Sequence, residues 1–283
     1  MSVKTICALI FWVSAFSCVA QAQDLDGCVA LDEPLCVYTQ NRDEKLQVRV
    51  LNNRAFDMTL WFDLKLVNMS VLASAPTVFV AKANSDTFYG EIGIVDKYQD
   101  SSYQYSYESL RGNALALHSE DALYQLPYKT GTTHYVSQSC STLGSHKDKA
   151  NRYAIDFAMR IGTPIMAARG GRVVDLYELS NSGGTSTLHY DKGNFVTIEH
   201  EDGTLGDYHH LKTMGVKVQI GDVVKAGQII ALSGNTGYSS GPHLHFSVLT
   251  TTKAKEHSSV LVNWKTARGV LSCPREGLAL KSL

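Results

Sequence analysis

Short apolar alternations interrupted by turn residues run along the chain, and they restrict its fold more than any other feature. In these segments every second side chain is apolar, which is typical of strands with one buried face. Asn52-Asn53 and Asp96-Lys97 fall between them and favour turns. The first half therefore predicts a small antiparallel β-sandwich. Its alternating segments are residues 46–50, 58–62, 64–66, 78–80 and 103–107.

The second half is also rich in predicted strands, such as residues 172–176 and 194–198. Turn-rich segments such as residues 182–184 and 201–203 separate them. Only residues 259–268 are compatible with a short helix. We therefore expect a mostly β protein.

Glycine and histidine are concentrated in the second half. Sixteen of the 22 glycines lie between Gly131 and Gly241, and no histidine precedes His118. The first half is therefore poor in side chains that carry chemistry. We expect a β-rich N-terminal domain over residues 23–120 and a second domain over residues 121–283.

The overall composition is that of a globular protein. The chain has 283 residues, of which 44% are hydrophobic and 19% charged, with a net charge of -1. A nucleic-acid-binding protein would show a basic face, so we expect no nucleic-acid partner. We also expect no transmembrane segment, and the sequence does not specify the oligomeric state.

The first residues predict a cleaved secretion signal. Lys4 supplies the positive charge, residues 7–15 are apolar but too short to span a bilayer, and Ala20-Gln21-Ala22 is a small-x-small cleavage site. We expect residues 1–22 to be removed after Ala22 and the protein to be periplasmic or secreted. The alternatives are a buried N-terminal strand and a lipoprotein signal that ends at Cys18.

Four cysteines would remain after this cleavage, an even number that suits an oxidising compartment. They allow three pairings. We favour Cys28–Cys36, which closes a short loop, and Cys140–Cys273, which ties the start of the second half to the C-terminus. Free or zinc-binding cysteines are the alternative, but no Cys-x-x-Cys spacing supports them.

The segment Gly241-Pro242-His243-Leu244-His245-Phe246 carries two histidines in an apolar run. Side chains two residues apart in a strand leave it on the same face, so both imidazoles address one place. Two neutral imidazoles suit a divalent transition metal, most often zinc. The alternative is a pair of hydrogen-bonded strand histidines.

Asp156 and His146 are the next candidates for a metal site. Asp156 is flanked by apolar residues, and a buried carboxylate needs a partner such as a metal or an ion pair. His146 lies ten residues before it. Asp148 is an alternative carboxylate, although its lysine neighbours Lys147 and Lys149 suggest a solvated loop.

Two further segments accompany these residues. In residues 208–211 (YHHL), a strand would turn Tyr208 and His210 to one face and His209 to the other. The glycine-rich residues 234–241 lead into the histidine pair, but they lack the Lys-Ser/Thr of a phosphate-binding loop. The absence of a His-Glu-x-x-His segment excludes a thermolysin-type site.

Eight segments between about residues 126 and 249 resemble, in their order and amino-acid sequence, those of the lysostaphin- and LytM-type zinc metallopeptidases that cut peptidoglycan cross-links. The segments are residues 153–158 (YAIDFA), 162–165 (GTPI), 167–169 (AAR), 208–211 (YHHL), 221–224 (GDVV), 227–230 (GQII), 233–237 (SGNTG) and 241–246 (GPHLHF).

The resemblance implies an antiparallel β-sheet metallopeptidase domain after a small β-sandwich-like domain. It implies that zinc (Zn2+) is bound by His146, Asp156 and His245, and that His210 and His243 are catalytic groups. Many members hold the first ligand four residues before the aspartate, where this chain has Arg152. The ligand must therefore be His146, which a longer loop brings to the site.

The function implied is a zinc endopeptidase that hydrolyses the peptide cross-links of peptidoglycan, with its stem peptides as partners. Three protein ligands leave one tetrahedral position open, as in catalytic zinc sites. The alternative is a degenerate member that binds the cell wall or another protein and regulates other hydrolases. A lipoyl-like hairpin at residues 219–227 is a poorer interpretation, because Lys225 is not at a hairpin tip.

Overall fold

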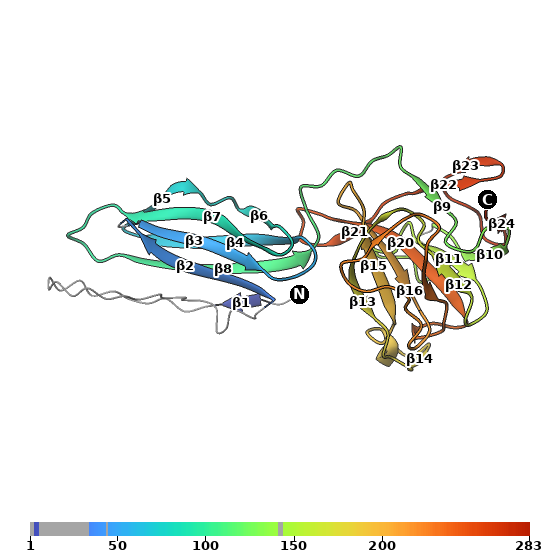
Figure 1. Cartoon of the computed structure of the whole chain (residues 1–283). Helices are drawn as coiled ribbons and strands as arrows, with labels where there is room; N and C mark the ends of the chain where they lie inside the picture. Colours follow the sequence, from blue (N-terminus) through green and yellow to red (C-terminus); the bar gives the residue numbers. More distant parts are fainter. Residues whose placement is uncertain (1–2, 6–33, 44, 141–143) are drawn as a thin grey trace. The chain divides into compact units, whose positions relative to one another are not determined.

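The computed structural model describes residues 3–5, 34–43, 45–140 and 144–283. Two compact units divide the chain: the first runs to Ala114 and includes Lys253–Lys255, and the second comprises Leu115–Thr252 and Glu256–Leu283. Both consist of strands and turns (Figure 1). Over the described residues the only helical element is one 3₁₀ turn, η1 (Thr187–His189). The expectation of a mostly β protein is confirmed.

The first unit contains two four-stranded sheets, in the orders β1-β8-β4-β6 and β2-β3-β7-β5. Aromatic side chains join their inner faces: Phe62 of β4 stacks on Tyr89 of β7 at 4.0 Å between ring centroids. The alternation of apolar residues over 46–50 is also seen in β3, where every second side chain is buried. The strands are β1 (Val3–Thr5), β2 (Leu35–Arg42), β3 (Lys45–Asn52), β4 (Met58–Val67), β5 (Met69–Ser74), β6 (Val78–Ala81), β7 (Ser85–Ile94) and β8 (Ser102–Arg111).

The second unit is built on a nine-stranded sheet, in which β17-β13-β15-β16-β20-β11-β10-β24 are neighbours in that order and β21 pairs with β20. Its strands are β10 (Thr133–Gln138), β11 (Ile155–Ala158), β13 (Gly171–Tyr177), β15 (Phe195–Glu199), β16 (Leu205–His209), β17 (Val223–Val224), β20 (His243–Thr251), β21 (His257–Ser259) and β24 (Ala279–Lys281). Smaller sheets are formed by β12 (Pro164–Met166) with β18 (Ile229–Leu232), by β14 (Gly183–Gly184) with β19 (Gly237–Tyr238), and by β9 (Leu123–Gln125), β22 (Asn263–Thr266) and β23 (Gly269–Leu271).

The core of this unit lies on one face of the large sheet. Trp264 of β22 is fully buried and packs against Tyr124, Phe157 and Phe246. The fully buried Tyr208 lies 4.9 Å from Phe246, ring centroid to ring centroid. Because successive strand residues point to opposite faces, the residues between these aromatic side chains project from the other side of the sheet. The core therefore fixes which residues of β11, β16 and β20 can form a site.

The expected short helix over residues 259–268 is wrong. This segment contains the end of β21 and the whole of β22. Its buried apolar side chains, Val262 and Trp264, are two residues apart, which is the period of a strand. β22 is paired in parallel with β9 and antiparallel with β23, which gives residues 263–266 strand partners on both sides.

Two other expectations fall partly or wholly outside the described residues. Of the expected secretion signal, only Val3–Thr5 is described, and it pairs with β8. The expected Cys28–Cys36 disulfide involves Cys28, which lies outside the described residues.

The expected Cys140–Cys273 disulfide is present, with 5.9 Å between its Cα atoms. Over the described part of the chain, no helix is long and apolar enough to cross a membrane.

Candidate metal centre

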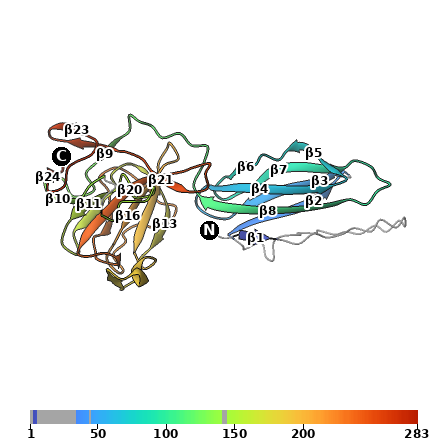
Figure 2. The same cartoon turned by 180° about the vertical axis from the view of Figure 1, so that it is seen from behind.

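Two residues of the candidate site are fixed directly by strand register. Asp156 of β11 is paired with His245 of β20, and His245 is paired with His209 of β16. These three strands lie side by side in both views (Figure 1, Figure 2). Paired residues share a face, so the three side chains form a row across the sheet opposite the aromatic core. His245 Nδ1 donates a hydrogen bond of 2.9 Å to Asp156 Oδ1.

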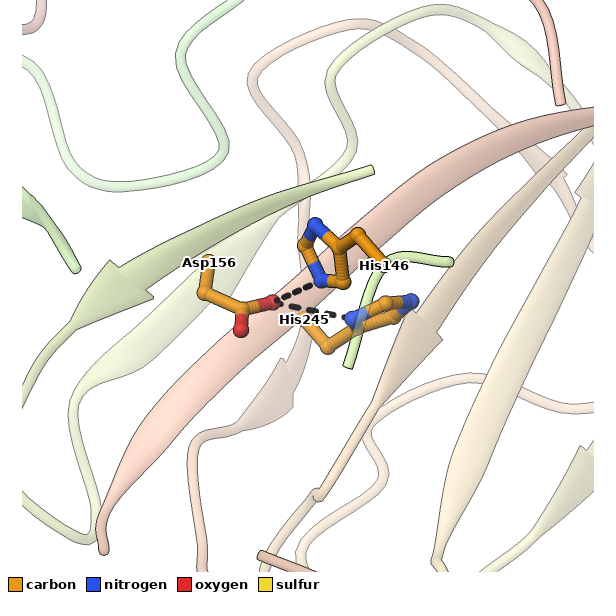
Figure 3. A group of neighbouring side chains, drawn as sticks. All are labelled: His146, Asp156 and His245. Atoms are coloured by element: carbon orange, nitrogen blue, oxygen red, sulfur yellow. Dashed lines mark hydrogen bonds and ion pairs between the residues drawn. The ribbon is translucent and has the colours of Figure 1, made fainter. Parts of the chain in front are cut away.

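The third residue, His146, comes from a turn region that precedes β11. Its side chain is buried, and its Nδ1 donates a hydrogen bond of 3.0 Å to the backbone carbonyl of Ser139. This bond leaves Nε2 as the unprotonated nitrogen, and Nε2 lies 3.4 Å from Asp156 Oδ1. His146 thus meets Asp156 and His245 from outside the sheet (Figure 3).

The three side chains fit a tetrahedral divalent metal. One ligand atom from each of His146, Asp156 and His245 lies within 4.8 Å of the other two. Atoms held about 2.1 Å from a tetrahedral zinc ion lie about 3.4 Å from each other, close to the spacings given above. The buried Nε2 of His146 makes no hydrogen bond to any described atom, so this nitrogen is available to bind a metal ion. Two imidazoles and one carboxylate are the donor set of many zinc enzymes.

The charges of the cluster also suit a cation. Burial would raise the pKa of Asp156, but the neighbouring His146 and His245 imidazoles outweigh it and hold the pKa far below its ordinary value. Burial lowers the pKa of His245, and Asp156 only partly opposes this shift. Burial also disfavours the charged form of His146, but interaction with Asp156 prevails and raises its pKa. Asp156 is thus a carboxylate at neutral pH, and it favours the charged form of His146 but does not overcome the effect of burial on His245.

His243 lies beside this cluster on the same strand as His245. Its Nε2 is 3.6 Å from Asp156 Oδ2. Its Nδ1 donates to the carbonyl of Gly241 at 2.8 Å, and Ser239 Oγ lies 3.2 Å from the same nitrogen. With Nδ1 protonated, Nε2 is the nitrogen that can accept a proton.

His210 reaches the site because the backbone turns sharply after β16. Its φ of 60° is in the left-handed region, which few residues other than glycine adopt. Its ring lies 4.5 Å from that of His243 and 5.9 Å from that of His245, centroid to centroid. Its Nδ1 donates to the Thr236 carbonyl at 2.7 Å. Burial, followed by the neighbouring histidines, lowers the pKa of His210 to about 3, so it is neutral at pH 7.

Close backbone contacts between loops hold Thr236 in place. Gly237 has a φ of 81°, and a Cβ atom there would lie 2.7 Å from the Cα atom of Gly193. Next to it, the buried Asn194 accepts a bond from the Ser180 amide and donates to the Ser180 carbonyl. Thr236 Oγ1 accepts from the Asn194 amide and donates to the carbonyl of Leu211, the residue after His210.

The expectation for residues 208–211 is wrong in its geometry. Tyr208 is buried in the core, whereas His209 and His210 both lie on the side of the candidate metal centre. The strand ends at His209, so the alternation expected for a continuous strand does not extend to His210. The alternative carboxylate, Asp148, is exposed and accepts bonds from the amides of Ala150 and Asn151. Asp148 therefore caps a turn.

The structure brings together all five residues predicted for the site: His146, Asp156, His210, His243 and His245. Sequence reasoning missed the backbone carbonyls of Ser139 and Thr236, which orient His146 and His210. Thr236 belongs to the glycine-rich loop noted before the histidine pair. Ser139 gave no signal, because every residue carries a carbonyl.

Comparison with known proteins finds similarity in the segment that carries most of this site. The family model of Peptidase family M23 matches residues 150–257, a range that begins after His146. Glycyl-glycine endopeptidase ALE-1 of Staphylococcus capitis is 44% identical over 103 residues, 36% of this chain and 25% of that protein. Peptidoglycan DD-endopeptidase ShyA of Vibrio cholerae is 40% identical over 94 residues, 33% of this chain and 19% of that protein.

The catalytic domain of the antimicrobial peptidase lysostaphin from Staphylococcus simulans has also been solved. It is 32% identical, with 51% of this chain and 88% of that chain covered and a TM-score of 0.29. The chain covers a quarter or less of the length of the two curated relatives above. The segment that the family model matches carries Asp156, His210, His243 and His245. Through this segment the chain belongs to peptidase family M23.

Proposed function

We propose that the protein is a periplasmic or secreted zinc endopeptidase that hydrolyses the peptide cross-links of bacterial peptidoglycan. The observation that carries the proposal is the buried cluster of His146, Asp156 and His245, with two further histidines beside it. The relatives named as a glycyl-glycine endopeptidase and as a peptidoglycan DD-endopeptidase support the substrate class.

His146, Asp156 and His245 would hold the metal, and the low pKa of Asp156 keeps its negative charge available at neutral pH. When bound there, zinc supplies Lewis acidity to the scissile carbonyl and to water. One carboxylate and two neutral imidazoles leave a divalent ion with one net positive charge. That positive charge would stabilise the negative charge that develops on the carbonyl oxygen of the substrate during hydrolysis.

His210 and His243 would handle the protons of the reaction. Each donates Nδ1–H to a backbone carbonyl, so each has an unprotonated Nε2. One of these two nitrogens would take a proton from water and then pass it to the leaving amine. The hydrogen bonds to Thr236 and Gly241 hold both rings in orientation while the proton moves.

The test combines metal analysis with product analysis. Purified protein should contain zinc and should release cross-link fragments from peptidoglycan, identified by mass, and a chelator should abolish their release. His243→Ala should retain the metal but lose hydrolysis, and His245→Ala should lose the metal. His118→Ala removes a histidine of the same unit that lies outside the cluster, and it should keep both properties.

Retention of zinc by His245→Ala would contradict the ligand assignment. If the unmodified chain bound zinc but cut no cross-link, the peptidase proposal would be wrong and a binding role would replace it.

A further inference from the structure

The three metal ligands are held in different ways. Asp156 and His245 sit on paired strands, whose ladder of backbone hydrogen bonds fixes their separation. His146 lies in a turn, outside any strand. The hydrogen bond from its Nδ1 to the Ser139 carbonyl sets the orientation of its ring. The place of His146 in the cluster thus depends on where Ser139 is held.

Ser139 is in turn anchored to the C-terminal segment. It is buried, and its Oγ donates a hydrogen bond of 2.5 Å to the Pro274 carbonyl. The same Oγ lies 3.5 Å from the sulfur of Cys140 and 3.5 Å from that of Cys273. The residues after β10 and the segment that contains Pro274 are therefore joined covalently beside Ser139 by the Cys140–Cys273 disulfide.

We propose that this disulfide is a positioning element of the metal centre. It holds Ser139 against Pro274, and the Ser139 carbonyl then holds His146 where its Nε2 can bind the metal. The proposal rests on the proposed function only in taking His146 as a ligand. Groups that orient a ligating histidine through its other nitrogen contribute about 10–100-fold to metal affinity. The affinity for metal should therefore depend on the redox state of the disulfide.

The disulfide can be reached by a reductant. Cys273 is exposed, whereas Cys140 is half-buried. A small dithiol would attack the exposed sulfur as a thiolate and release the other cysteine. Its second thiol would then displace Cys273. The dithiol leaves as its own disulfide, having given up two electrons, and both cysteines end as thiols. The covalent link beside Ser139 is then lost while His146 itself is unchanged.

The experiment measures zinc affinity by competition with a chromophoric chelator. It compares the oxidised protein, the protein reduced by a dithiol and alkylated before the reagents are removed, and the Cys140→Ser/Cys273→Ser variant. We expect both altered forms to bind zinc about 10–100-fold more weakly. The dithiol treatment should have no further effect on the double variant, which is the matched control. Circular dichroism at the same temperature must show all forms folded.

A double-mutant cycle separates positioning from general loosening. Removing the disulfide in a His146→Ala background should change zinc affinity little, because the contact on which the disulfide acts is already gone. An equal loss of affinity with and without His146 would overturn the proposal, as would equal affinities of the folded oxidised and reduced proteins. Absence of zinc binding by the oxidised protein would instead overturn the proposed function and this inference with it.

Discussion

His200 is a buried histidine that the folded protein holds in its neutral form. It is 3% exposed, and its Nδ1 donates to the Gly170 carbonyl at 2.9 Å. Its ring packs edge-on against Tyr124. Burial is the main cause that lowers the pKa of His200 to about 4, and the nearby Arg169 cation acts in the same direction. Acid should therefore destabilise the fold through this residue.

The sign and size of this pH-dependent change in stability follow from the linkage between protonation and folding. Because the folded pKa lies below the unfolded value of about 6.5, the stabilisation is complete above pH 6.5 and falls as the pH drops toward 4. Between about pH 7.5 and about pH 5, protonation of the unfolded state should cost about 2 kcal/mol of unfolding free energy. Below about pH 4 the folded state also binds the proton, and no further stability is lost through His200.

The assay is urea denaturation of metal-free protein at both pH values, for the wild type and for His200→Gln. The glutamine amide can still donate to the Gly170 carbonyl but does not titrate. Other histidines whose pKa differs between the folded and unfolded states, such as His146 and His210, are present in both proteins and cancel in the comparison. The wild type should lose about 2 kcal/mol more than the variant between the two pH values. An equal loss in both proteins would refute a neutral, buried His200.

Two predictions concern contacts that support the site. Tyr208→Phe removes the hydroxyl that accepts a 2.7 Å hydrogen bond from the Ala168 amide, and it should destabilise the fold by about 1–3 kcal/mol in denaturant titration; an unchanged midpoint would count against that bond. Gly237→Ala requires a left-handed backbone and meets Gly193, so it should cost more than about 1 kcal/mol and also slow hydrolysis, because it displaces the carbonyl that holds His210. Normal stability and rate in that variant would show that the loops can move apart freely.

The sequence predicted the strands well where burial alternates strictly. Residues 46–50 and the apolar run around His243 and His245 follow the two-residue period, and both segments are strands. Residues 259–268 were misassigned because a short apolar run fits either period. What decides its form is the packing of Trp264 against aromatic residues far away in the sequence.

The side chains of the candidate site were predictable from the sequence, but the backbone groups that orient them were not. His243, His245 and Asp156 were recognisable because imidazoles and a carboxylate stand out among apolar neighbours. The direction of His210 was not predictable, because it depends on a single left-handed residue after β16. The partners of His146 and His210 are main-chain oxygens, which any residue type could provide.

The stretch of residues 144–154 follows the disulfide-bonded Cys140 and precedes β11, and a metal at His146 would attach this stretch to the sheet. The disulfide opens only under reducing conditions, whereas the link through the metal is lost whenever a chelator removes the ion. Susceptibility of this stretch to proteases, and its rate of amide exchange, should therefore report metal occupancy even when no substrate is present.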